Sequence, residues 1–398
     1  MSVKISNRVA QIKPSATITV SQKARDLKAA GREIISLGFG EPDFDTPQHI
    51  KDAANAAIAA GRTKYTPIPG TEELREAIVS KFRRDNGLEY NINQIIVSNG
   101  AKQSLFNLLL ALLNEDEEVI IPAPYWVSYP DMVKLAGGQP VILNAGAESD
   151  FKITARQLES SLTDNTRLLI LNSPSNPTGK VYGASENRAL GEVLQEHPKV
   201  LIACDDIYEH IYWAESPFRT LLNDCPDLAD RTVVINGVSK AFAMTGWRIG
   251  YAAGPEDLVK AMSKVQSQST SGASSISQAA ATAALNGPQD CVADMCSEFK
   301  HRHDYLIHAL DDIEGVECLE CDGAFYAFPS FAGVIERLPD VRDDVELASW
   351  FLEHAGVAMV PGSAFGAPGH LRLSFATSME NLENCIARIR RSLESTTA

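Results

Sequence analysis

The chain has 398 residues with ordinary apolar and charged fractions of 44% and 22%, which predicts a globular protein of two or three domains. Its 36 basic and 51 acidic side chains give a formal net charge of -15, and this excess of negative charge argues against nucleic acid or an anionic membrane as a partner. No run approaches the ~20 apolar residues of a membrane span, and the odd number of scattered cysteines, seven, does not resemble a disulfide framework, so we expect a cytoplasmic protein.

The chain begins with a predicted polar arm, residues 6–19, followed by a helical run at 21–30 that stops at Gly31. A short strand at 34–37 then enters a Gly/Pro turn that contains Gly40. This glycine could let a ligand approach the backbone closely, or it could serve the turn alone. The residues by themselves do not separate these two interpretations.

An alanine-rich helix is predicted at 50–60, and a loop too rich in proline to be helical follows at 64–70. The loop contains Tyr65. On composition alone, Tyr65 is most simply a packed aromatic side chain.

From residue 94 onward, apolar strands alternate with helical stretches, which predicts an α/β fold with a mostly parallel sheet covered by helices. The seven predicted strands lie near 94–98, 118–122, 139–144, 166–172, 199–204, 232–236 and 247–252. After a helix-rich stretch at 255–309, strands near 315–320, 324–328 and 371–375 predict a smaller α+β domain. We expect an N-terminal arm with part of the small domain at 1–45, a large domain at 46–290 and a small C-terminal domain at 291–398.

The loops that follow the strands of the large domain hold the candidate functional residues. Gly100, Ala101 and Lys102 connect the first strand to a helix at 103–113, and the free N–H groups of a helix start can bind a phosphate. The loop is neither a Walker loop nor a GxGxxG fingerprint, which removes the usual nucleotide-binding interpretations. Trp126, after the second strand, is on composition more simply a core residue.

Two further strands end on polar residues. The fourth strand is followed by the turn 172–179, which contains Asn176, and the fifth ends on Asp205, where the apolar sequence stops. Tyr208 follows in the same loop. Because the carboxyl ends of parallel strands are where open α/β sheets bind ligands, these side chains are candidates for a binding site.

Lys240 follows the sixth strand, whose β-branched and apolar residues end at a glycine. A lysine in a dry pocket at a sheet edge has a lowered pKa and can react as a neutral amine, so Lys240 is a candidate Schiff-base lysine. Arg248 offers a planar donor fork to an oxyanion such as a phosphate, and Ser239 offers a second donor.

The run from Ser239 to Gly250 closely resembles the pyridoxal-phosphate lysine motif of the class I/II aminotransferases of fold-type I, and the resemblance extends from about Ser6 to the C-terminus. It implies a pyridoxal 5'-phosphate enzyme in which Lys240 is the catalytic residue. It also implies a homodimer with shared active sites, acting on amino acid and 2-oxo acid substrates.

The resemblance assigns roles to the residues that match its motifs. Tyr65 would reach the cofactor phosphate of the other subunit, and Trp126 would stack on the pyridine ring. Asp205 would keep the ring nitrogen protonated, which makes the ring a better electron sink. Four further roles are implied: Tyr208 as donor to the phenolic oxygen, Asn176 as partner of that oxygen and of the substrate carboxylate, Gly40 as pocket lining, and Arg372 as bidentate ligand of the α-carboxylate. The family usually has Asp-Glu where this chain has Asp205-Asp206.

Within the family, the segments 13–17, 40–44 and 99–103 most resemble the bacterial subgroup of aspartate aminotransferases, some of which also transaminate prephenate. An acidic protein that selects a dicarboxylate needs local cations. Lys102 could point into the pocket, and Lys13, with Thr17 beside it, lies on an arm that in this subgroup folds over the site. The sequence therefore predicts transfer of the amino group between L-aspartate and 2-oxoglutarate.

Other functions stay open at this stage. Relatives with nearly the same motifs act on alanine or aromatic amino acids, and a pyridoxal-phosphate C–S lyase would share the scaffold. The sequence argues against a transcriptional regulator, which would normally carry a fused DNA-binding domain, and against a nicotinamide dehydrogenase, because the glycine fingerprint is missing.

Three polar segments are predicted to have no part in the chemistry. The histidines show no metal-ligand spacing, and His301-Arg302-His303 is predicted to lie on the solvated face of a helix. Cys318 and Cys321 have no second pair with which to bind zinc, and they are interpreted as two thiols around a strand. The acidic segment 340–346 is predicted to be a solvated turn.

Overall fold

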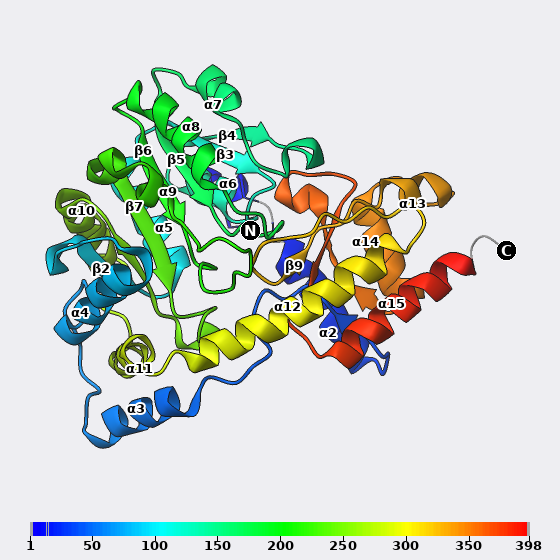
Figure 1. The fold of residues 1–398 in the computed structure, drawn as a ribbon, viewed down its shortest axis with the longest axis horizontal. Helices are drawn as coiled ribbons and strands as arrows, with labels where there is room; N and C mark the ends of the chain where they lie inside the picture. The colour runs from blue at the N-terminus through cyan, green and yellow to red at the C-terminus, as the bar shows by residue number, and fades with distance from the viewer. Residues whose placement is uncertain (1–2, 13, 15, 396–398) are drawn as a thin grey trace.

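A computed structural model of the chain describes residues 3–12, 14 and 16–395. Its centre is a seven-stranded sheet with the strand order β2-β8-β7-β6-β5-β3-β4 (Figure 1). Only β8 runs antiparallel to its neighbours in this sheet, and the other pairings are parallel. The prediction of a mostly parallel seven-stranded sheet is confirmed. The strands are β2 (Ile95–Ser98), β3 (Glu118–Ala123), β4 (Gln139–Asn144), β5 (Thr166–Asn172), β6 (Leu201–Asp205), β7 (Thr232–Gly237) and β8 (Gly250–Ala253).

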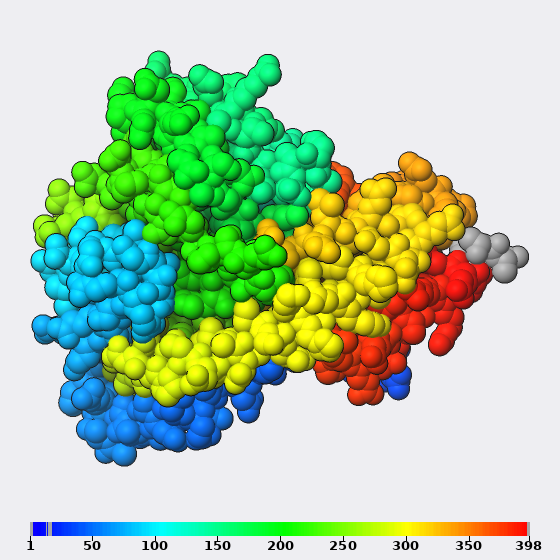
Figure 2. Space-filling view, in the orientation of Figure 1, coloured from blue at the N-terminus to red at the C-terminus, as the bar shows by residue number. Residues whose placement is uncertain are grey.

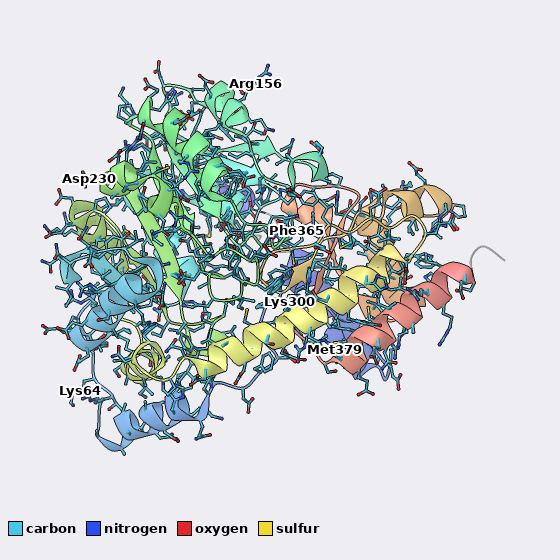
Figure 3. The ribbon with its side chains drawn as sticks, viewed as in Figure 1. Lys64, Arg156, Asp230, Lys300, Phe365 and Met379 are labelled. Carbon is cyan, nitrogen blue, oxygen red and sulfur yellow. The ribbon has the colours of Figure 1, made fainter. Side chains whose placement is uncertain are left out.

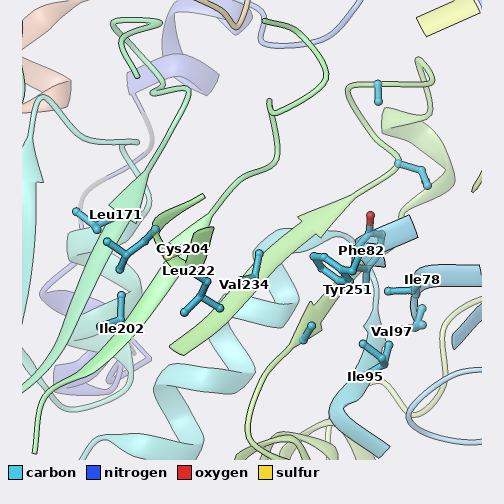
Figure 4. Packing of buried hydrophobic residues seen from close by; sticks show 14 of the residues in the cluster. Ile78, Phe82, Ile95, Val97, Leu171, Ile202, Cys204, Leu222, Val234 and Tyr251 are labelled. Atoms are coloured by element: carbon cyan, nitrogen blue, oxygen red, sulfur yellow. The ribbon is translucent and has the colours of Figure 1, made fainter. Parts of the chain in front are cut away.

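Helices cover both faces of the sheet because its strands are apolar on both sides. In β5, Leu168 and Ile170 face one cluster of buried side chains, whereas Leu169 and Leu171 face another. The first cluster is closed by α5 (Ala101–Leu112), α6 (Tyr129–Leu135) and α10 (Glu256–Ser267). The second cluster, part of which is drawn in Figure 4, is closed by α3 (Gln48–Ala59), α4 (Glu72–Lys81), α7 (Ala155–Ser161), α8 (Ala184–Gln195), α9 (Leu221–Asp224) and α11 (Ser275–Asn286).

A smaller part of the molecule forms around two short sheets. β1 (Ile35–Ser36) pairs with β10 (Val357–Ala358), and β12 (Leu371–Ser374) lies between β11 (Val360–Pro361) and β9 (Tyr326–Ala327). The 22-residue α12 (Asp290–Asp311) runs from beside α11 to this part, and its side chains form a continuous yellow band in Figure 2. Lys300 on α12 and Met379 at the start of α15 are labelled in Figure 3. The remaining helices are α1 (Asn7–Ala10), α2 (Ala16–Ala29), α13 (Ala332–Arg337), α14 (Asp344–His354) and α15 (Met379–Glu394).

This topology gathers the candidate loops at one edge of the large sheet. The strands β2, β3, β5, β6 and β7 all run in the same direction, so their carboxyl ends lie together. β8 runs in the opposite direction and begins at this edge, at Gly250, just beyond Arg248 and Ile249. The predicted domain division after residues 45 and 290 stays a prediction.

Several local expectations were wrong. Helix α2 begins at Ala16, within the segment predicted to be an arm. The last predicted strand of the large sheet begins only at Gly250 because Thr245–Trp247 forms a 3₁₀ turn and Arg248 has a left-handed φ of 56°. No strand forms at 315–320, where the described backbone makes a single bridge between Glu317 and Ser330.

Two of the polar segments are not solvated as predicted. Arg302 and His303 are buried, and Arg302 pairs with Asp43 at 2.7 Å and with Glu298 at 3.0 Å. Asp344 is buried as well, because its carboxylate accepts hydrogen bonds from the backbone N–H and the hydroxyl of Ser363. Both sets of residues make ion pairs or hydrogen bonds inside the protein, which the polarity of the sequence alone does not reveal.

Within the described residues, no helix combines the length and the apolar character that crossing a membrane requires. The same part of the chain contains no group of three or more His, Cys, Asp or Glu side chains that could hold a metal ion. Cys318 and Cys321 are both buried free thiols.

Candidate active site

A pocket of about 490 Å³ opens at the carboxyl edge of the large sheet, where this edge meets β9 and β12. The structure brings eleven of the predicted residues together in its lining. These are Gly40, Ala101, Lys102, Trp126, Asn176, Asp205, Tyr208, Ser239, Lys240, Arg248 and Arg372. They come from chain segments more than 300 residues apart, so the pocket depends on the complete fold.

The charge of this lining is opposite to that of the whole chain. Four basic side chains, Lys102, Lys240, Arg248 and Arg372, face two acidic ones, Glu41 and Asp205, in the pocket, although the chain carries a formal net charge of -15. An excess of positive charge in a concave, partly desolvated site attracts anionic ligands. The pocket is therefore suited to phosphate and carboxylate groups.

Lys240 lies in the pocket with its Nζ donating a hydrogen bond to the carbonyl oxygen of Gly40 at 2.5 Å. Burial lowers the pKa of Lys240 to about 8; Glu41 opposes this shift, and Arg372 and Arg248 add to it. At pH 7 about a tenth of the population is then a neutral amine, far more than for a lysine with the usual pKa. Such an amine can attack a carbonyl carbon and can carry a proton.

Asp205 ends β6 and presents one unpaired oxygen. Its Oδ2 accepts a hydrogen bond of 2.6 Å from the hydroxyl of Tyr129, whereas its buried Oδ1 has no hydrogen-bond partner among the described residues. Burial raises the pKa of Asp205 to about 6, and the bond from Tyr129 opposes this rise. A buried carboxylate oxygen without a partner is costly unless a ligand supplies a donor.

Arg372 is a buried cation with no carboxylate partner among the described side chains. Its Nη1 donates to Asn176 Oδ1 at 2.9 Å and its Nη2 to the carbonyl oxygen of Gly38 at 2.7 Å. The guanidinium lies over the ring of Tyr326, 4.5 Å from its centre. A guanidinium held by neutral acceptors in a dry site is prepared to bind a carboxylate bidentately.

A small anion fits the turn at the start of α5. Gly100 caps this helix with a φ of 85°, and a Cβ atom there would collide with the guanidinium of Arg248. The first N–H groups of the helix, beginning with Ala101, have no carbonyl within the helix to bond. Ser239 and Arg248 line the same pocket, so a phosphate could receive backbone, hydroxyl and guanidinium donors there.

Two aromatic contacts shape the remaining walls. The Nζ of Lys102 lies 4.6 Å from the centre of the Trp126 ring. The hydroxyls of Tyr208 and Tyr326 are 2.8 Å apart, and a Cβ atom on Gly40 would reach to 2.5 Å of the Tyr326 hydroxyl. Position 40 therefore needs a residue without a side chain.

Some predicted residues lie elsewhere. Gly100 stands behind Arg248, outside the lining, and Tyr65 is 99% exposed on its loop. Lys13 lies outside the described residues. The backbone of Thr17 lies in α2, but its side chain is not described.

Sequence reasoning missed Tyr129, Tyr326 and Glu41, all of which line the pocket. Tyr129 lies three residues after Trp126 in the same aromatic segment, and this spacing could have drawn attention to it. Tyr326 is buried in an apolar run of the small part, where no local pattern distinguishes it from a core residue. Its position beside Tyr208 follows only from the tertiary fold.

The geometry agrees with comparisons to known proteins. The family model for aminotransferase class I and II matches residues 32–389. An aspartate/prephenate aminotransferase from Nitrosomonas europaea is 54% identical over 392 residues, covering 97% of this chain and 99% of the relative.

Two solved structures share the fold closely. The aspartate aminotransferase from Rhizobium meliloti has a TM-score of 0.95 and 46% identity, covering 99% of both chains. That from Thermus thermophilus with maleate has a TM-score of 0.92 and 42% identity, covering 98% of this chain and 100% of the other. The sheet topology, the pocket and these similarities together show that the chain belongs to the class I and II aminotransferases.

Proposed function

We propose that this protein is a pyridoxal-phosphate-dependent aspartate aminotransferase that passes the amino group from L-aspartate to 2-oxoglutarate, with prephenate as a further acceptor. The observation that carries the proposal is the meeting of three chemical features in one pocket. These are the Lys240 amine, the free oxygen of Asp205 and the carboxylate-free guanidinium of Arg372. The turn before α5, where Gly100 lies against Arg248, adds a fourth feature.

These features fit the parts of pyridoxal phosphate. The turn before α5, with Ser239 and Arg248, suits the phosphate, and the free Oδ1 of Asp205 suits a protonated ring nitrogen. Tyr208 and Asn176 provide polar groups for the phenolic oxygen, and Trp126 provides a ring for stacking. When bound, the cofactor would supply a carbonyl group that reacts with amines and a conjugated cationic ring that delocalises the negative charge left on the substrate's α-carbon when its proton is removed.

Arg372, Lys240 and Asp205 have separate roles in the rest of the reaction. Arg372, oriented by Asn176 and Gly38, binds the α-carboxylate of the substrate. Lys240, as a neutral amine, would remove the α-proton of the substrate and deliver it to the carbon that the cofactor's carbonyl group supplies, which a pKa of about 8 for Lys240 permits near neutral pH. Asp205 holds the proton on the ring nitrogen throughout, since Tyr129 fixes its other oxygen.

Choice of a dicarboxylate is supported by the surplus of cations in the pocket and by the relatives. Two of the compared relatives bear the name aspartate aminotransferase, and the Thermus thermophilus protein was solved with maleate, itself a dicarboxylate. Of the two lysines in the pocket, Lys240 is assigned to the cofactor and to proton transfer, which leaves Lys102, a lysine without an ion pair among the described side chains. We therefore assign it to the distal carboxylate.

A panel of half-reactions tests the proposal. Aspartate added without an oxo acid should change the cofactor absorbance once, releasing one oxaloacetate per site, and 2-oxoglutarate should reverse the change. Alanine and aromatic amino acids should react more slowly at equal concentration. Continuous release of ammonia and an oxo acid would instead identify a lyase, and preference for alanine or an aromatic donor would overturn the aspartate assignment.

Lys102→Ala should selectively weaken dicarboxylate use. Loss of a hydrogen bond to a charged group costs about 1.5–3 kcal/mol, so kcat/KM for aspartate should fall about 10- to 150-fold. Alanine, which has no distal carboxylate, should be nearly unaffected and serves as the internal control. Lys13→Ala should harm prephenate more than aspartate, because the second carboxylate of prephenate is farther from the reacting carbon. Equal losses for all three substrates would show that these lysines do not recognise the distal carboxylate.

Tyr65 is proposed to complete the site of a second subunit, because its side chain is exposed and does not line the pocket of its own chain. In a two-fold dimer, a Tyr65→Phe chain paired with a Lys240→Ala chain regenerates one site free of both changes. Co-expressed mixed dimers should then show about half of the wild-type activity. The Tyr65→Phe homodimer should bind the cofactor about tenfold more weakly. The assay is run at a cofactor concentration that fills the wild-type site but not the Tyr65→Phe site, and mixed dimers no more active than the Tyr65→Phe homodimer under these conditions would refute the shared site.

A further inference from the structure

A buried ion pair that no step of the chemistry uses lies next to the pocket. Lys81, the last residue of α4, is fully buried and pairs with Glu209, whose side chain is 3% exposed. The Nζ of Lys81 lies 4.8 Å from the centre of the Phe82 ring, and Figure 4 shows Phe82 beside Tyr251, whose ring centre is 5.9 Å away. Glu209 directly follows Tyr208 in the chain and lies four residues after Asp205. Neither member of the pair lines the pocket.

The Glu209 carboxylate joins three separate segments. Its Oε1 accepts from Lys81 Nζ and from Asn236 Nδ2 at 2.7 Å, and its Oε2 accepts from Asn86 Nδ2 at 2.6 Å. Asn236 lies near the end of β7, and its own Oδ1 accepts from the N–H of Gly237 at 2.7 Å. The carboxylate thus ties the loop of Asp205 and Tyr208 to the strand end that leads to Lys240.

Glu209 is ionised in this setting. Burial would raise its pKa, but the charges of Lys81 and His210 and the hydrogen bonds from Lys81 and Asn86 outweigh burial and hold the pKa below its usual value. An ionised carboxylate can accept on both oxygens at once, which the two asparagines require. A neutral amide could not replace it, because one of its two ends only donates.

Stability alone does not explain such a pair. Burying two charges carries a desolvation penalty that can exceed their attraction, and well-packed apolar residues often serve stability equally well. The Lys81–Glu209 pair with Asn86 and Asn236, here called the hub, does, however, hold neighbouring loops in one arrangement. Such an arrangement matters because catalytic groups must be held within about 0.5 Å of their working geometry. The segments that this hub holds carry three of the proposed site residues.

We propose that Glu209, held by Lys81, is a positioning residue that fixes Asp205 and Tyr208 relative to Lys240. This inference rests on the proposed roles of those three residues. It predicts that breaking the hub loosens the cofactor site even though neither Lys81 nor Glu209 touches it.

Glu209→Gln tests the inference, because the amide keeps the shape but can accept from only one asparagine. We expect the dissociation constant for pyridoxal phosphate, titrated into cofactor-free protein, to rise about tenfold and kcat to fall about 10- to 100-fold. The KM for 2-oxoglutarate should change less than about threefold, since the hydrogen bonds that orient Arg372 go to Asn176 and Gly38, neither of which contacts Glu209. The pH midpoint for labelling the Lys240 amine in cofactor-free protein, read by peptide mass spectrometry, should also shift.

Two further variants keep the test decisive. Lys81→Met/Glu209→Gln removes both charges, so it should regain thermal stability relative to either single change while still binding the cofactor weakly. Lys152→Met is the control, because it breaks a different ion pair in the same half of the molecule, in which Lys152 Nζ lies 2.7 Å from Oε1 of Glu186, away from the pocket lining. This variant should leave cofactor affinity and the labelling midpoint unchanged.

Wild-type cofactor affinity, kcat and labelling midpoint in a folded Glu209→Gln or in the double variant would overturn the positioning role. That failure is separable from failure of the proposed function. If Lys240→Ala is inactive while the hub variants behave as wild type, only the hub inference is wrong. If Lys240→Ala stays active, the site assignment itself is wrong.

Discussion

Lys240→Ala should lower kcat/KM for aspartate by about four orders of magnitude or more. A positioned general acid–base contributes about 10²–10⁴-fold by itself, and this change also removes the amine to which we assign the covalent link to the cofactor. Pyridoxal phosphate should still bind through the turn before α5 and Arg248, because neither is altered. Steady-state rates, together with a titration of cofactor binding, measure both effects.

The control is Lys260→Ala, which removes a lysine on the exposed side of α10 and should behave as wild type. Circular dichroism should show that both variants are folded. Activity of the folded Lys240→Ala protein within tenfold of wild type would mean that another group carries the proton.

Asp205→Asn should slow α-proton removal by about 10²–10³-fold, the effect of deleting one fixed electrostatic contact to the charge that develops in a transition state. The asparagine side chain can still accept from Tyr129, so the fold should be kept, but it cannot hold a proton on the ring nitrogen. Single-turnover rates with aspartate and with α-deuterated aspartate measure the step directly. An unchanged rate would show that the carboxylate is structural.

The same substitution should stabilise the cofactor-free protein. Burial raises the pKa of Asp205 from 3.8 to about 6, so the folded state binds the carboxyl proton more tightly than the unfolded state does. The stability that this proton contributes is present below about pH 4 and is lost as the pH rises to above 6. Asparagine avoids that loss, which for a shift of this size is about 1–3 kcal/mol. Urea unfolding at equal protomer concentration should show a gain for Asp205→Asn at pH 8 and little difference near pH 4. A less stable variant at pH 8 would contradict the burial argument.

The two effects of Asp205→Asn have one origin. A carboxylate oxygen that is buried without a partner destabilises the protein until a cationic donor arrives. Added pyridoxal phosphate should therefore stabilise the wild type more than it stabilises Asp205→Asn.

Much of the fold was predictable because its strands are short apolar runs that end on polar residues. β3, β4, β5 and β7 lie within one residue of their predicted limits. The loops after β3, β5 and β7 contain Trp126, Asn176 and Lys240, Asp205 ends β6, and parallel topology brings such strand ends together. The order of strands and loops along the chain therefore suffices to predict that these four residues share one edge of the sheet.

What the sequence did not reveal depends on contacts between distant segments. Tyr326 pairs with Tyr208 across 118 positions, and Glu209 pairs with Lys81 across 128. Arg302 was predicted to be solvated because its neighbours are polar, yet Asp43, 259 positions away, gives it a buried partner. Local patterns report the polarity of a residue but not the partner that makes its burial possible.

Chemical mapping of the cofactor attachment tests the central claim most directly. The purified protein, saturated with pyridoxal phosphate and reduced with borohydride, would be digested and its modified peptide identified by mass spectrometry. Our account predicts that the modification lies on Lys240, one per chain, and that prior addition of aspartate without an oxo acid prevents it. Modification of Lys102 or another lysine with Lys240 left free, or modification unaffected by aspartate, would contradict it.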